Sequence, residues 1–330
     1  MANQILVIFF MRVLITGITG FVGFHLNEFL RKKGYEIFGT TFSGKTQVSE
    51  NIILCDIRDP ARIKEIVLKI RPHQIYHLSA LSFSPDSIKN PKMTFDINFY
   101  GTMNLMEAAR EGAPDSHILF VGSADEYGEV SSRYGPVTED CPLNPLSPYS
   151  VSKASADLLS SFYAKKYGMH IVRVRPFNHT GPGQRSEFVC SDFARQIAEI
   201  ECGMRDPILS TGNLDVQRDF SDVRDMVVSY WLALEKGIPG EAYNICSEKT
   251  YSIRWILETL LKFTDRYVEI KEDSSKLRTA DVTFLKGDCS KFKMITGWRP
   301  TIPFEKTLSD LLNYWRLKAE ERQAEGSLQP

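Results

Sequence analysis

Short, almost entirely apolar runs alternate with amphipathic segments through the first half of the chain. The first clear run covers residues 12–16 and ends at Gly17. Continuous apolar runs of this length are typical of strands buried on both faces of a parallel sheet. We expect further strands of this type over residues 35–40, 51–56, 74–78, 117–121 and 170–175, and a late one over 240–245.

The segments between these runs have helical periodicity. After the first strand, four apolar side chains share one helical face: Val22, Leu26, Phe29 and Leu30. Regular alternation of strands and helices predicts an α/β fold with a doubly wound parallel Rossmann sheet. The pattern becomes irregular after Pro176, where a smaller C-terminal α/β part is expected.

Composition places the chain among ordinary globular proteins. Apolar residues make up 43% and charged residues 25%, which excludes collagen-like, coiled-coil and disordered proteins. Lysine and arginine number 40 against 41 aspartates and glutamates, for a formal net charge of -1. We therefore expect no nucleic-acid partner and a local site for any anionic ligand.

Other features of the composition bear on location. The longest apolar run, residues 5–15, is interrupted by Arg12 and is shorter than the about 20 residues that span a bilayer. It also lacks the basic start and the small-residue cleavage site of a signal peptide. Six scattered cysteines without CxxC spacing are typical of reduced thiols, so a cytoplasmic location without membrane contact is expected.

The histidines show no metal-ligand spacing, and no metal is expected. Because Met11 begins the first strand, residues 1–10 are interpreted as a leader or a misassigned start.

Three glycines follow the first strand and open the first helix. Gly17, Gly20 and Gly23 allow the chain to turn sharply, to bring backbone N–H groups against a diphosphate and to pack the helix closely on the strand. Three loop glycines also occur by chance. Their position between a strand and a helix at the start of an α/β pattern nevertheless indicates a dinucleotide site.

The ends of the second and third strands bear on the choice of cofactor. The acid that usually binds an NAD ribose is missing from residues 39–45. Thr41, Ser43 or Lys45 could instead accept a 2′-phosphate, which favours NADP and leaves NAD possible. Lys45 is equally well explained as a solvated loop lysine. Asp56 ends the third strand, where it either accepts from the adenine amino group or caps the following turn.

A tyrosine and a lysine four residues apart are the leading catalytic candidates. Ser147 and Pro148 predict the start of a helix, so Tyr149 and Lys153 share one face of its first turns. A free tyrosine has a pKa of about 10. A nearby ammonium and the helix N-terminus should both favour the phenolate, which would make Tyr149 a working proton donor. A tyrosine and a lysine at this spacing are common on helix surfaces. Because the chain also has the glycine motif and Ser123 at the end of an earlier strand, the pair here indicates catalysis.

Together, these motifs resemble the extended short-chain dehydrogenase/reductase family. The resemblance runs from about residue 11 to residue 315 and includes 77–80, 98–102 and 175–178. It implies an NAD(P)-dependent enzyme in which Ser123, Tyr149 and Lys153 are catalytic. The positions that it assigns to the cofactor are Gly17, Thr19, Gly20, Phe21, Val22, Gly23, Thr41, Asp56, Ile57, Leu78, Ser79, Ala80, Asn98, Tyr149, Lys153 and Pro176.

Segments of the second half resemble one branch of that family, the GDP-mannose 4,6-dehydratases and the GDP-6-deoxy-4-keto-mannose reductases. The similar segments are 177–184, 187–189, 212–215, 218–220 and 278–281. The resemblance implies a GDP-sugar substrate, with two arginines on its diphosphate and a carboxylate on a ribose hydroxyl. The implied substrate-binding residues are Ser82, Asp125, Asn178, Phe188, Val189, Arg218, Arg278 and Asp281.

Two departures from the dehydratase pattern favour the reductases. The dehydratases carry a threonine at the position of Ser123 and, two residues on, a glutamate that removes the C5 proton. Here Asp125 stands in its place, although the adjacent Glu126 makes the alignment ambiguous. The dehydratases also carry an arginine pair after the second strand, which is missing from residues 41–43. We therefore expect NADPH-dependent reduction of the C4 ketone of GDP-4-keto-6-deoxy-D-mannose to GDP-D-rhamnose. The alternatives are a 4,6-dehydratase, an epimerase and a non-catalytic dinucleotide sensor, and the sequence does not distinguish a rhamnose product from a talose product.

The resemblance also divides the chain. A dinucleotide-binding domain is expected over 11–177 with return segments at about 218–247, a substrate domain over 178–217 and 248–318, and tails over 1–10 and 319–330. A homodimer is expected through helices over 98–110 and 149–167, because the family pairs these helices. Both also carry more apolar positions than one sheet face needs: Leu105, Ala108, Ala109, Ala156, Leu159, Phe162 and Tyr163.

Overall fold

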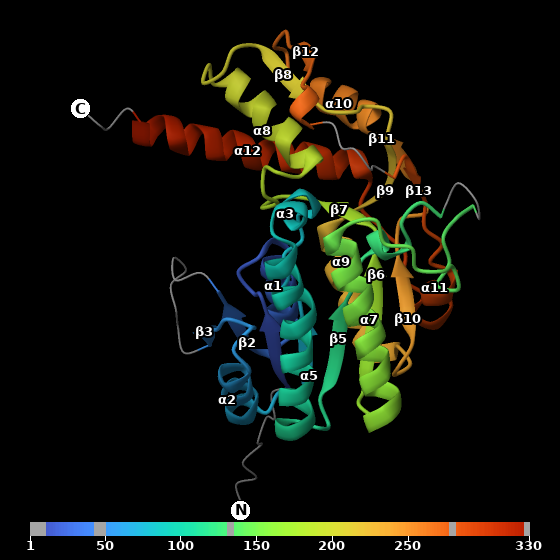
Figure 1. Ribbon diagram of the computed structural model, residues 1–330. Helices are drawn as coiled ribbons and strands as arrows, with labels where there is room; N and C mark the ends of the chain where they lie inside the picture. The colour runs from blue at the N-terminus through green and yellow to red at the C-terminus, as the bar shows by residue number, and fades with distance from the viewer. Residues whose placement is uncertain (1–10, 43–50, 131–134, 277–281, 327–330) are drawn as a thin grey trace, which may run out of the picture.

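A seven-stranded parallel sheet forms the larger part of the molecule (Figure 1). The structure is a computed structural model that describes residues 11–42, 51–130, 135–276 and 282–326. The strand order is β10-β6-β5-β4-β1-β2-β3, and every neighbouring pair is parallel. The bounds are β1 (Arg12–Thr16), β2 (Glu36–Thr41), β3 (Ile52–Leu54), β4 (Gln74–His77), β5 (His117–Val121), β6 (Ile171–Pro176) and β10 (Ala242–Ile245). The strands predicted at 12–16 and 117–121 are confirmed residue for residue, and the others differ by one or two residues at one or both ends.

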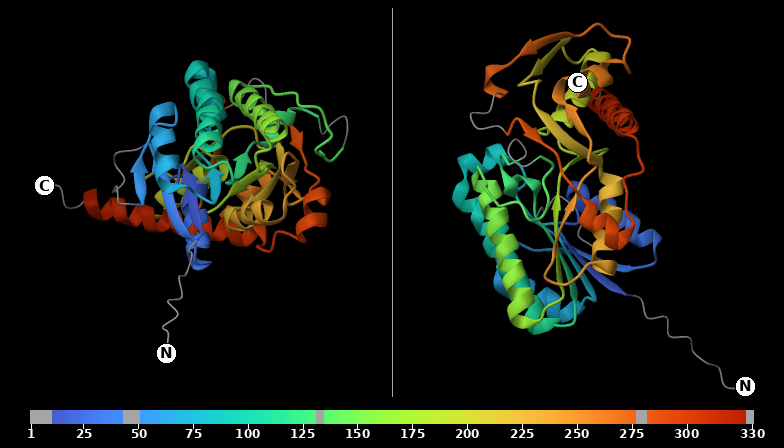
Figure 2. Two further views of the ribbon diagram at one scale, coloured as in Figure 1. Left: turned by 90° about the horizontal axis from the view of Figure 1, so that it is seen from below. Right: turned by 90° about the vertical axis from the view of Figure 1, so that its right-hand side faces the viewer.

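Helices cover both faces of this sheet, as the right-hand view of Figure 2 shows. One apolar cluster joins the sheet to α1 (Phe21–Lys32) and α9 (Val223–Lys236). A second cluster joins the other face to α2 (Pro60–Ile70), α5 (Gly101–Gly112) and α7 (Pro148–Tyr167). The predicted doubly wound Rossmann fold is confirmed. Ligands of such sheets bind at the carboxyl ends of the strands where the order reverses, which is here between β1 and β4.

The start of α7 follows from its local sequence. The Ser147 hydroxyl accepts a hydrogen bond from the backbone N–H of Ser150 (3.1 Å), and Pro148 occupies the first turn. The helix ends at Gly168, which adopts φ 68°. This confirms the predicted cap and places Tyr149 and Lys153 in the first two turns.

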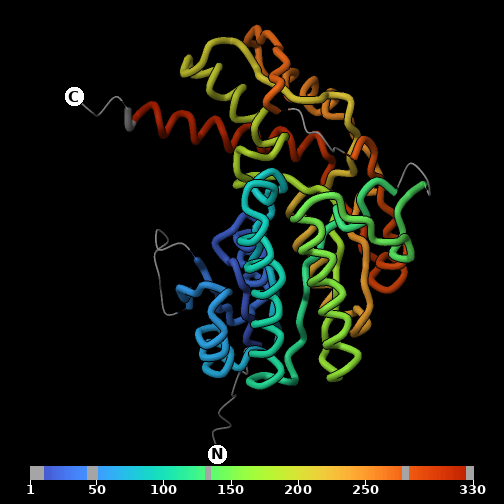
Figure 3. Tube along the Cα trace, viewed as in Figure 1, coloured from blue at the N-terminus to red at the C-terminus, as the bar shows by residue number. Residues whose placement is uncertain are grey.

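A smaller part lies at the carboxyl ends of the large sheet, because β7 (Asn178–Thr180) follows directly on β6. Its sheet is β11 (Thr250–Ser252), β9 (Gln217–Asp222) and β13 (Phe284–Leu285), with β7 paired to β9. A third apolar cluster joins α8 (Val189–Glu201), α10 (Ile253–Leu261) and α12 (Phe304–Gly326). A short parallel pair, β8 (Ile208–Thr211) and β12 (Glu269–Glu272), completes this part. The chain passes between the two parts more than once (Figure 3).

Three details correct the predicted division of the chain. β9 lies in the smaller sheet and not with the returning segments α9 and β10. Cys289, Phe292 and Trp298, which were assigned to the substrate domain, pack into the first core cluster of the large sheet. The predicted tail from 319 is helical as far as Gly326, and Ala319 is buried. Residues 1–10 lie outside the described residues. Within the described part of the chain, no helix has the length and apolar character needed to cross a membrane.

Candidate active site

The three predicted glycines form a close-packed turn between β1 and α1. Gly17 adopts φ +72°, and a Cβ on Gly23 would lie 2.3 Å from the carbonyl oxygen of Gly17. Gly20 is the N-cap of α1 and provides no side-chain cap, and the first turn contains no acidic residue. A diphosphate fits such a site, because the backbone N–H groups and the positive end of the helix dipole favour an anion. The half-buried Phe21 and Val22 follow directly.

The ends of β2 and β3 lie side by side at the expected position for the adenosine end of the cofactor. The hydroxyls of Thr19 and Thr41 are 2.8 Å apart. The carboxylate of Asp56 accepts from the Arg58 backbone N–H (3.0 Å) and pairs with the Arg58 guanidinium, which lowers the pKa of Asp56. Asp56 therefore caps its turn, as one of the two predicted roles requires, and its contact with the adenine amino group stays a prediction. Ser43 and Lys45 lie outside the described residues.

The sequence analysis missed Arg58, although this cationic residue lies only two positions after Asp56. Its guanidinium carbon lies 5.9 Å from the centroid of the Phe42 ring, so it reaches from the end of β3 toward the end of β2. A cavity of about 410 Å³ adjoins it, lined by Asp56, Arg58, Asp59, Asp96 and Tyr100. Ile57, the neighbouring predicted contact, is buried.

The exit from β4 is held against β1. The Thr16 hydroxyl accepts from the backbone N–H groups of Leu78 (3.1 Å) and Ser79 (3.2 Å). Leu78, Ser79 and Ala80 are half-buried, and their contact with the cofactor stays a prediction. Pro176, at the end of β6, is buried.

Asn98 supports this segment from behind. Its side chain accepts from Leu81 N–H (2.8 Å) and donates to the Leu81 carbonyl (3.1 Å) and the Ser152 hydroxyl (3.0 Å). It lies on a π-helical turn (Asp96–Tyr100) and is 2% exposed. The Asn98 amide thus joins the segment after β4 to α7, and its contact with the cofactor stays a prediction.

The three predicted catalytic side chains come together at the carboxyl ends of β5 and β6. Ser123 follows β5, and its side chain is close enough to Tyr149 to act on the pKa of the phenol. The Lys153 Nζ atom donates to the carbonyl of Val121 (2.7 Å), the last residue of β5. Ser123, Tyr149 and Lys153 are all at least nine-tenths buried.

The expectation that Lys153 lowers the pKa of Tyr149 is wrong for the protein without ligands. Burial raises the pKa of Tyr149, the negative charge of Asp125 adds to this, and the neighbouring Ser123 side chain opposes it. Burial also lowers the pKa of Lys153 to about 8, against the charges of Glu126 and Asp157. Desolvation is therefore the largest effect at both groups: at Tyr149 it acts together with the charge of Asp125 and keeps the phenol protonated, and at Lys153 it outweighs the two carboxylates.

The turn after Ser123 settles which of its two acids faces outward. Asp125 is exposed, and its charge acts on Tyr149. Glu126 is fully buried, and its Oε1 atom accepts from the backbone N–H of Ser123 (2.7 Å). Asp125 is thus the acid beside the catalytic candidates. The sequence analysis noticed Glu126 only as an ambiguity of alignment.

Predicted substrate residues are spread over the smaller part and the loop after β4. Ser82 and Asn178 are exposed, the latter at the start of β7. Phe188 precedes Val189 at the start of α8 and packs on Phe83, with ring centroids 5.6 Å apart. This contact joins the smaller part to the loop after β4. A further predicted residue, Arg218, lies on β9, and its Nη1 atom donates to the Gln217 carbonyl (3.0 Å).

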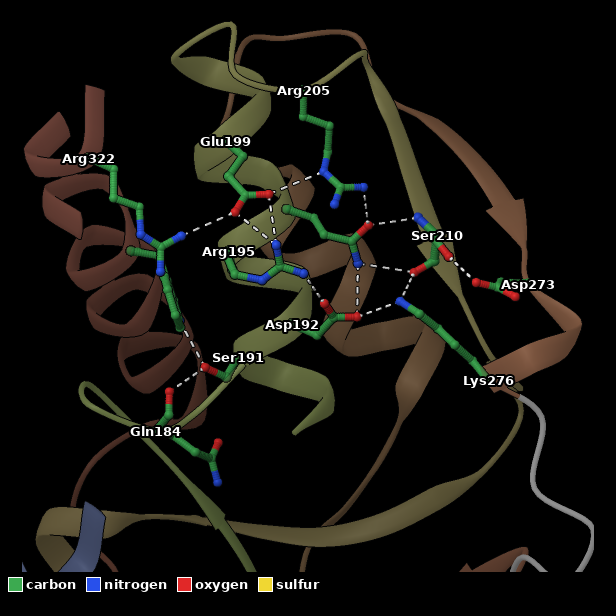
Figure 4. Close-up of polar contacts among 12 residues, drawn as sticks. Gln184, Ser191, Asp192, Arg195, Glu199, Arg205, Ser210, Asp273, Lys276 and Arg322 are labelled. Atoms are coloured by element: carbon green, nitrogen blue, oxygen red, sulfur yellow. Dashed lines mark hydrogen bonds and ion pairs between the residues drawn. The ribbon is translucent and has the colours of Figure 1, made fainter. Parts of the chain in front are cut away.

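Arg278 and Asp281 lie outside the described residues, but the residue that leads to them is well held. Lys276 Nζ donates to Asp192 Oδ2 (2.7 Å) and to the Ser210 carbonyl (2.9 Å), as Figure 4 shows. These contacts tie the chain before residue 277 to α8 and β8.

Comparisons with known proteins agree with this arrangement. The GDP-mannose 4,6 dehydratase family matches residues 14–311. A GDP-6-deoxy-D-mannose reductase of Pseudomonas aeruginosa is 32% identical over 310 residues, covering 94% of this chain and 99% of the relative. GDP-mannose 4,6 dehydratase 2 of Arabidopsis thaliana is 31% identical over 326 residues, covering 91% of this chain and 85% of the relative. The solved structure of RMD from Pseudomonas aeruginosa complexed with NADPH has a TM-score of 0.82 and 31% identity, covering 93% of this chain and 99% of that one. The predicted resemblance is confirmed, and the chain belongs to the GDP-mannose 4,6-dehydratase family.

Proposed function

We propose that this protein reduces the C4 ketone of GDP-4-keto-6-deoxy-D-mannose with NADPH and so forms GDP-D-rhamnose. The observation that carries the choice of reduction is the acid after Ser123. A 4,6-dehydratase needs a base that reaches the C5 proton. Asp125 is the exposed acid here, whereas Glu126 is buried and bound to the Ser123 N–H. An aspartate is one methylene shorter than a glutamate, and a displacement of about 1 Å can cost on the order of 10²-fold in rate.

Two observations support NADPH as the cofactor. The glycine turn, which has no room for a Cβ at Gly23, can hold the diphosphate. Thr41 and Arg58 stand near the expected position of the adenosine ribose, and a guanidinium suits a 2′-phosphate. When bound, the cofactor supplies the hydride that the ketone carbon accepts.

The protein's own residues supply the proton and the orientation. Tyr149 donates its phenolic proton to the C4 oxygen as the ketone becomes an alcohol, and Ser123 donates a hydrogen bond to the same oxygen. Lys153 holds the nicotinamide ribose and stabilises the phenolate that forms on Tyr149. Burial, which keeps Tyr149 protonated before the reaction, suits a proton donor.

The second candidate is a GDP-mannose 4,6-dehydratase. It uses the same three catalytic positions, and Arabidopsis thaliana dehydratase 2 is 31% identical to this chain. For this protein to be a dehydratase, Asp125 would have to remove the C5 proton.

We expect the purified protein to consume NADPH when given the 4-keto-6-deoxy sugar and to leave GDP-mannose unchanged in the presence of NADP⁺. Absorbance of the reduced cofactor measures the first reaction, and chromatography of the nucleotide sugars measures both. Sugar analysis of the product separates rhamnose from talose. Release of keto sugar from GDP-mannose, together with no NADPH consumption in the other tube, would establish the dehydratase instead.

We also propose a homodimer through α7 and the neighbouring α4 (Pro91–Phe95) and α5. The predicted reason is wrong in part, because most of the apolar positions named for it are buried within one protomer: Leu105, Ala108, Ala109, Ala156 and Tyr163. Leu159 is partly buried. In this region the exposed apolar side chains include Phe162, which was predicted, and five that were not: Met93, Tyr100, Val151, Leu158 and Tyr167. Exposed apolar patches of this kind mark protein interfaces.

Glutamates at positions 158 and 162 should convert the dimer to a monomer, because two charges would be buried in the interface. Leu158 is 61% exposed and Phe162 is 49% exposed, so the Leu158→Glu and Phe162→Glu pair should leave the protomer folded. Light scattering measures the mass of each species. The matched control is Phe24→Glu, an equally exposed apolar position on α1, across the sheet. A monomeric wild-type protein at micromolar concentration would contradict the dimer.

We propose a cytoplasmic location as well. All six cysteines are free thiols in the structure, which suits a reducing compartment.

A further inference from the structure

The first turn of α7 is held by a side chain from another helix. The backbone N–H groups at the start of a helix have no partner inside the helix. In α7, Pro148 has no N–H to satisfy, and the N–H of Ser150 donates to the Ser147 hydroxyl at 3.1 Å. The N–H between them, that of Tyr149, donates to Ser87 Oγ at 3.1 Å. The proposed proton donor is therefore held through its own backbone.

Ser87 is buried and makes two hydrogen bonds. It lies on the short helix α3 (Ser84–Lys89) and is 2% exposed. Its hydroxyl donates to the Ser84 carbonyl at 2.6 Å and accepts from the Tyr149 N–H with its oxygen. A hydroxyl that donates one hydrogen bond is also a better acceptor of another. The two bonds together fix the orientation of the Ser87 side chain.

The carbonyl of Tyr149 is held as well. Ser152 Oγ donates to it at 2.7 Å and accepts from the Asn98 amide at 3.0 Å. Asn98 in turn binds both backbone groups of Leu81. Leu81 and Ser87 belong to the same segment, the one that leaves β4. This segment therefore holds Tyr149 through both its N–H and its carbonyl.

The same segment contacts the smaller part of the molecule. Phe83, the N-cap of α3, packs on Phe188, with ring centroids 5.6 Å apart. The residue before it, Ser82, is exposed and is one of the predicted substrate-binding residues. One short stretch of chain thus carries a predicted substrate contact and the hydrogen-bond acceptor of the proposed proton donor.

Lys153 has a different support. Its Nζ atom donates at 2.7 Å to the carbonyl of Val121, the last residue of β5. The end of β5 therefore holds the ammonium, whereas α3 holds the turn that carries the phenol. A change at α3 should disturb the proton donor more than the group that is proposed to hold the cofactor.

We propose that Ser87 is a positioning residue for the reduction, which holds Tyr149 where its proton can pass to the C4 oxygen. The proposal rests on the proposed function of Tyr149. Proton transfer requires the donor within hydrogen-bond reach of the acceptor, and a displacement of about 1 Å can cost on the order of 10²-fold in rate. A looser first turn of α7 should therefore slow the chemical step and leave NADPH binding unchanged.

The deciding variant is Ser87→Ala, which removes the acceptor of the Tyr149 N–H without adding bulk at a buried position. We expect kcat to fall about tenfold, while the Kd for NADPH, measured by fluorescence, stays within about twofold of wild type. Hydrogen exchange of the Tyr149 amide should become about two- to tenfold faster. The matched control is Ser160→Ala, which removes a buried hydroxyl of the same helix that donates to the Ala156 carbonyl (2.7 Å). It should change none of these three quantities.

Three results would overturn the proposal: an unchanged kcat in Ser87→Ala, an equal loss of kcat in Ser160→Ala, or a loss of NADPH affinity as large as the loss of kcat. The last result would indicate a general disturbance of α7. Ser87→Cys keeps the test decisive if Ser87→Ala does not fold. Its thiol occupies the place of the hydroxyl but is a weak acceptor, so kcat should fall at least about threefold with NADPH binding intact. An unchanged kcat in Ser87→Cys would contradict the proposal.

Amide exchange and NADPH binding are measured without any sugar. A wild-type protein that leaves the keto sugar unreduced therefore rejects the proposed function. Equal exchange of the Tyr149 amide in the wild type and in Ser87→Ala rejects the hold by Ser87, whichever reaction the protein catalyses.

Discussion

Tyr149→Phe should lower kcat for ketone reduction by about 10²- to 10⁴-fold, the usual contribution of a positioned general acid. The variant loses the phenolic proton that the C4 oxygen receives, and it keeps the ring that packs 8% exposed beneath the site. The hydrogen bond from the Tyr149 backbone N–H to Ser87 Oγ (3.1 Å) also remains, so the start of α7 should be unchanged. NADPH binding, measured by fluorescence, should stay within about twofold of wild type.

The control for this prediction is Tyr167→Phe at the far end of the same helix, where the ring is 48% exposed. It should retain wild-type activity. If Tyr149→Phe kept more than about a tenth of the wild-type rate, a loss under about 1.4 kcal/mol, Tyr149 would not be the proton donor.

Lys153→Met should damage both cofactor binding and turnover. A hydrogen bond to a charged group contributes about 1.5–3 kcal/mol, so loss of the ammonium should weaken NADPH binding by about 10- to 100-fold. The developing phenolate on Tyr149 also loses the ammonium proposed to stabilise it, which should lower kcat in addition. Fluorescence titration and steady-state kinetics at saturating NADPH separate the two losses.

Methionine is the suitable replacement because it fills a similar volume in a site where Lys153 is 6% exposed. Lys165→Met, on the exposed last turns of α7, is the matched control and should change neither quantity. Normal NADPH affinity in Lys153→Met would show that Lys153 does not hold the cofactor.

The sequence predicted the parts of the site that depend on local rules. The cap at Ser147 and Pro148 fixes the start of α7, and helix periodicity then brings Tyr149 and Lys153 to one face. The glycine turn likewise follows from its place between a strand and a helix. Such features need no knowledge of distant parts of the chain.

What the sequence did not predict depends on burial. The pKa of Tyr149 was expected to fall because of a neighbouring charge, whereas enclosure by the fold raises it. The side of the turn on which Asp125 and Glu126 fall is likewise set by packing against α7 and β6. Two adjacent acids in one turn look alike in a sequence, and only the tertiary structure separates the exposed one from the buried one.

The order of the strands has a consequence for synthesis of the chain on the ribosome. β10, which completes the large sheet beside β6, begins at Ala242, and Trp298 closes the core on that side. The first 176 residues therefore emerge with β6 as an open edge and with apolar surface uncovered. Contacts between such distant segments form late, and open strand edges are prone to aggregation. A nascent chain of this protein should thus depend on chaperone protection until almost all of it has been made.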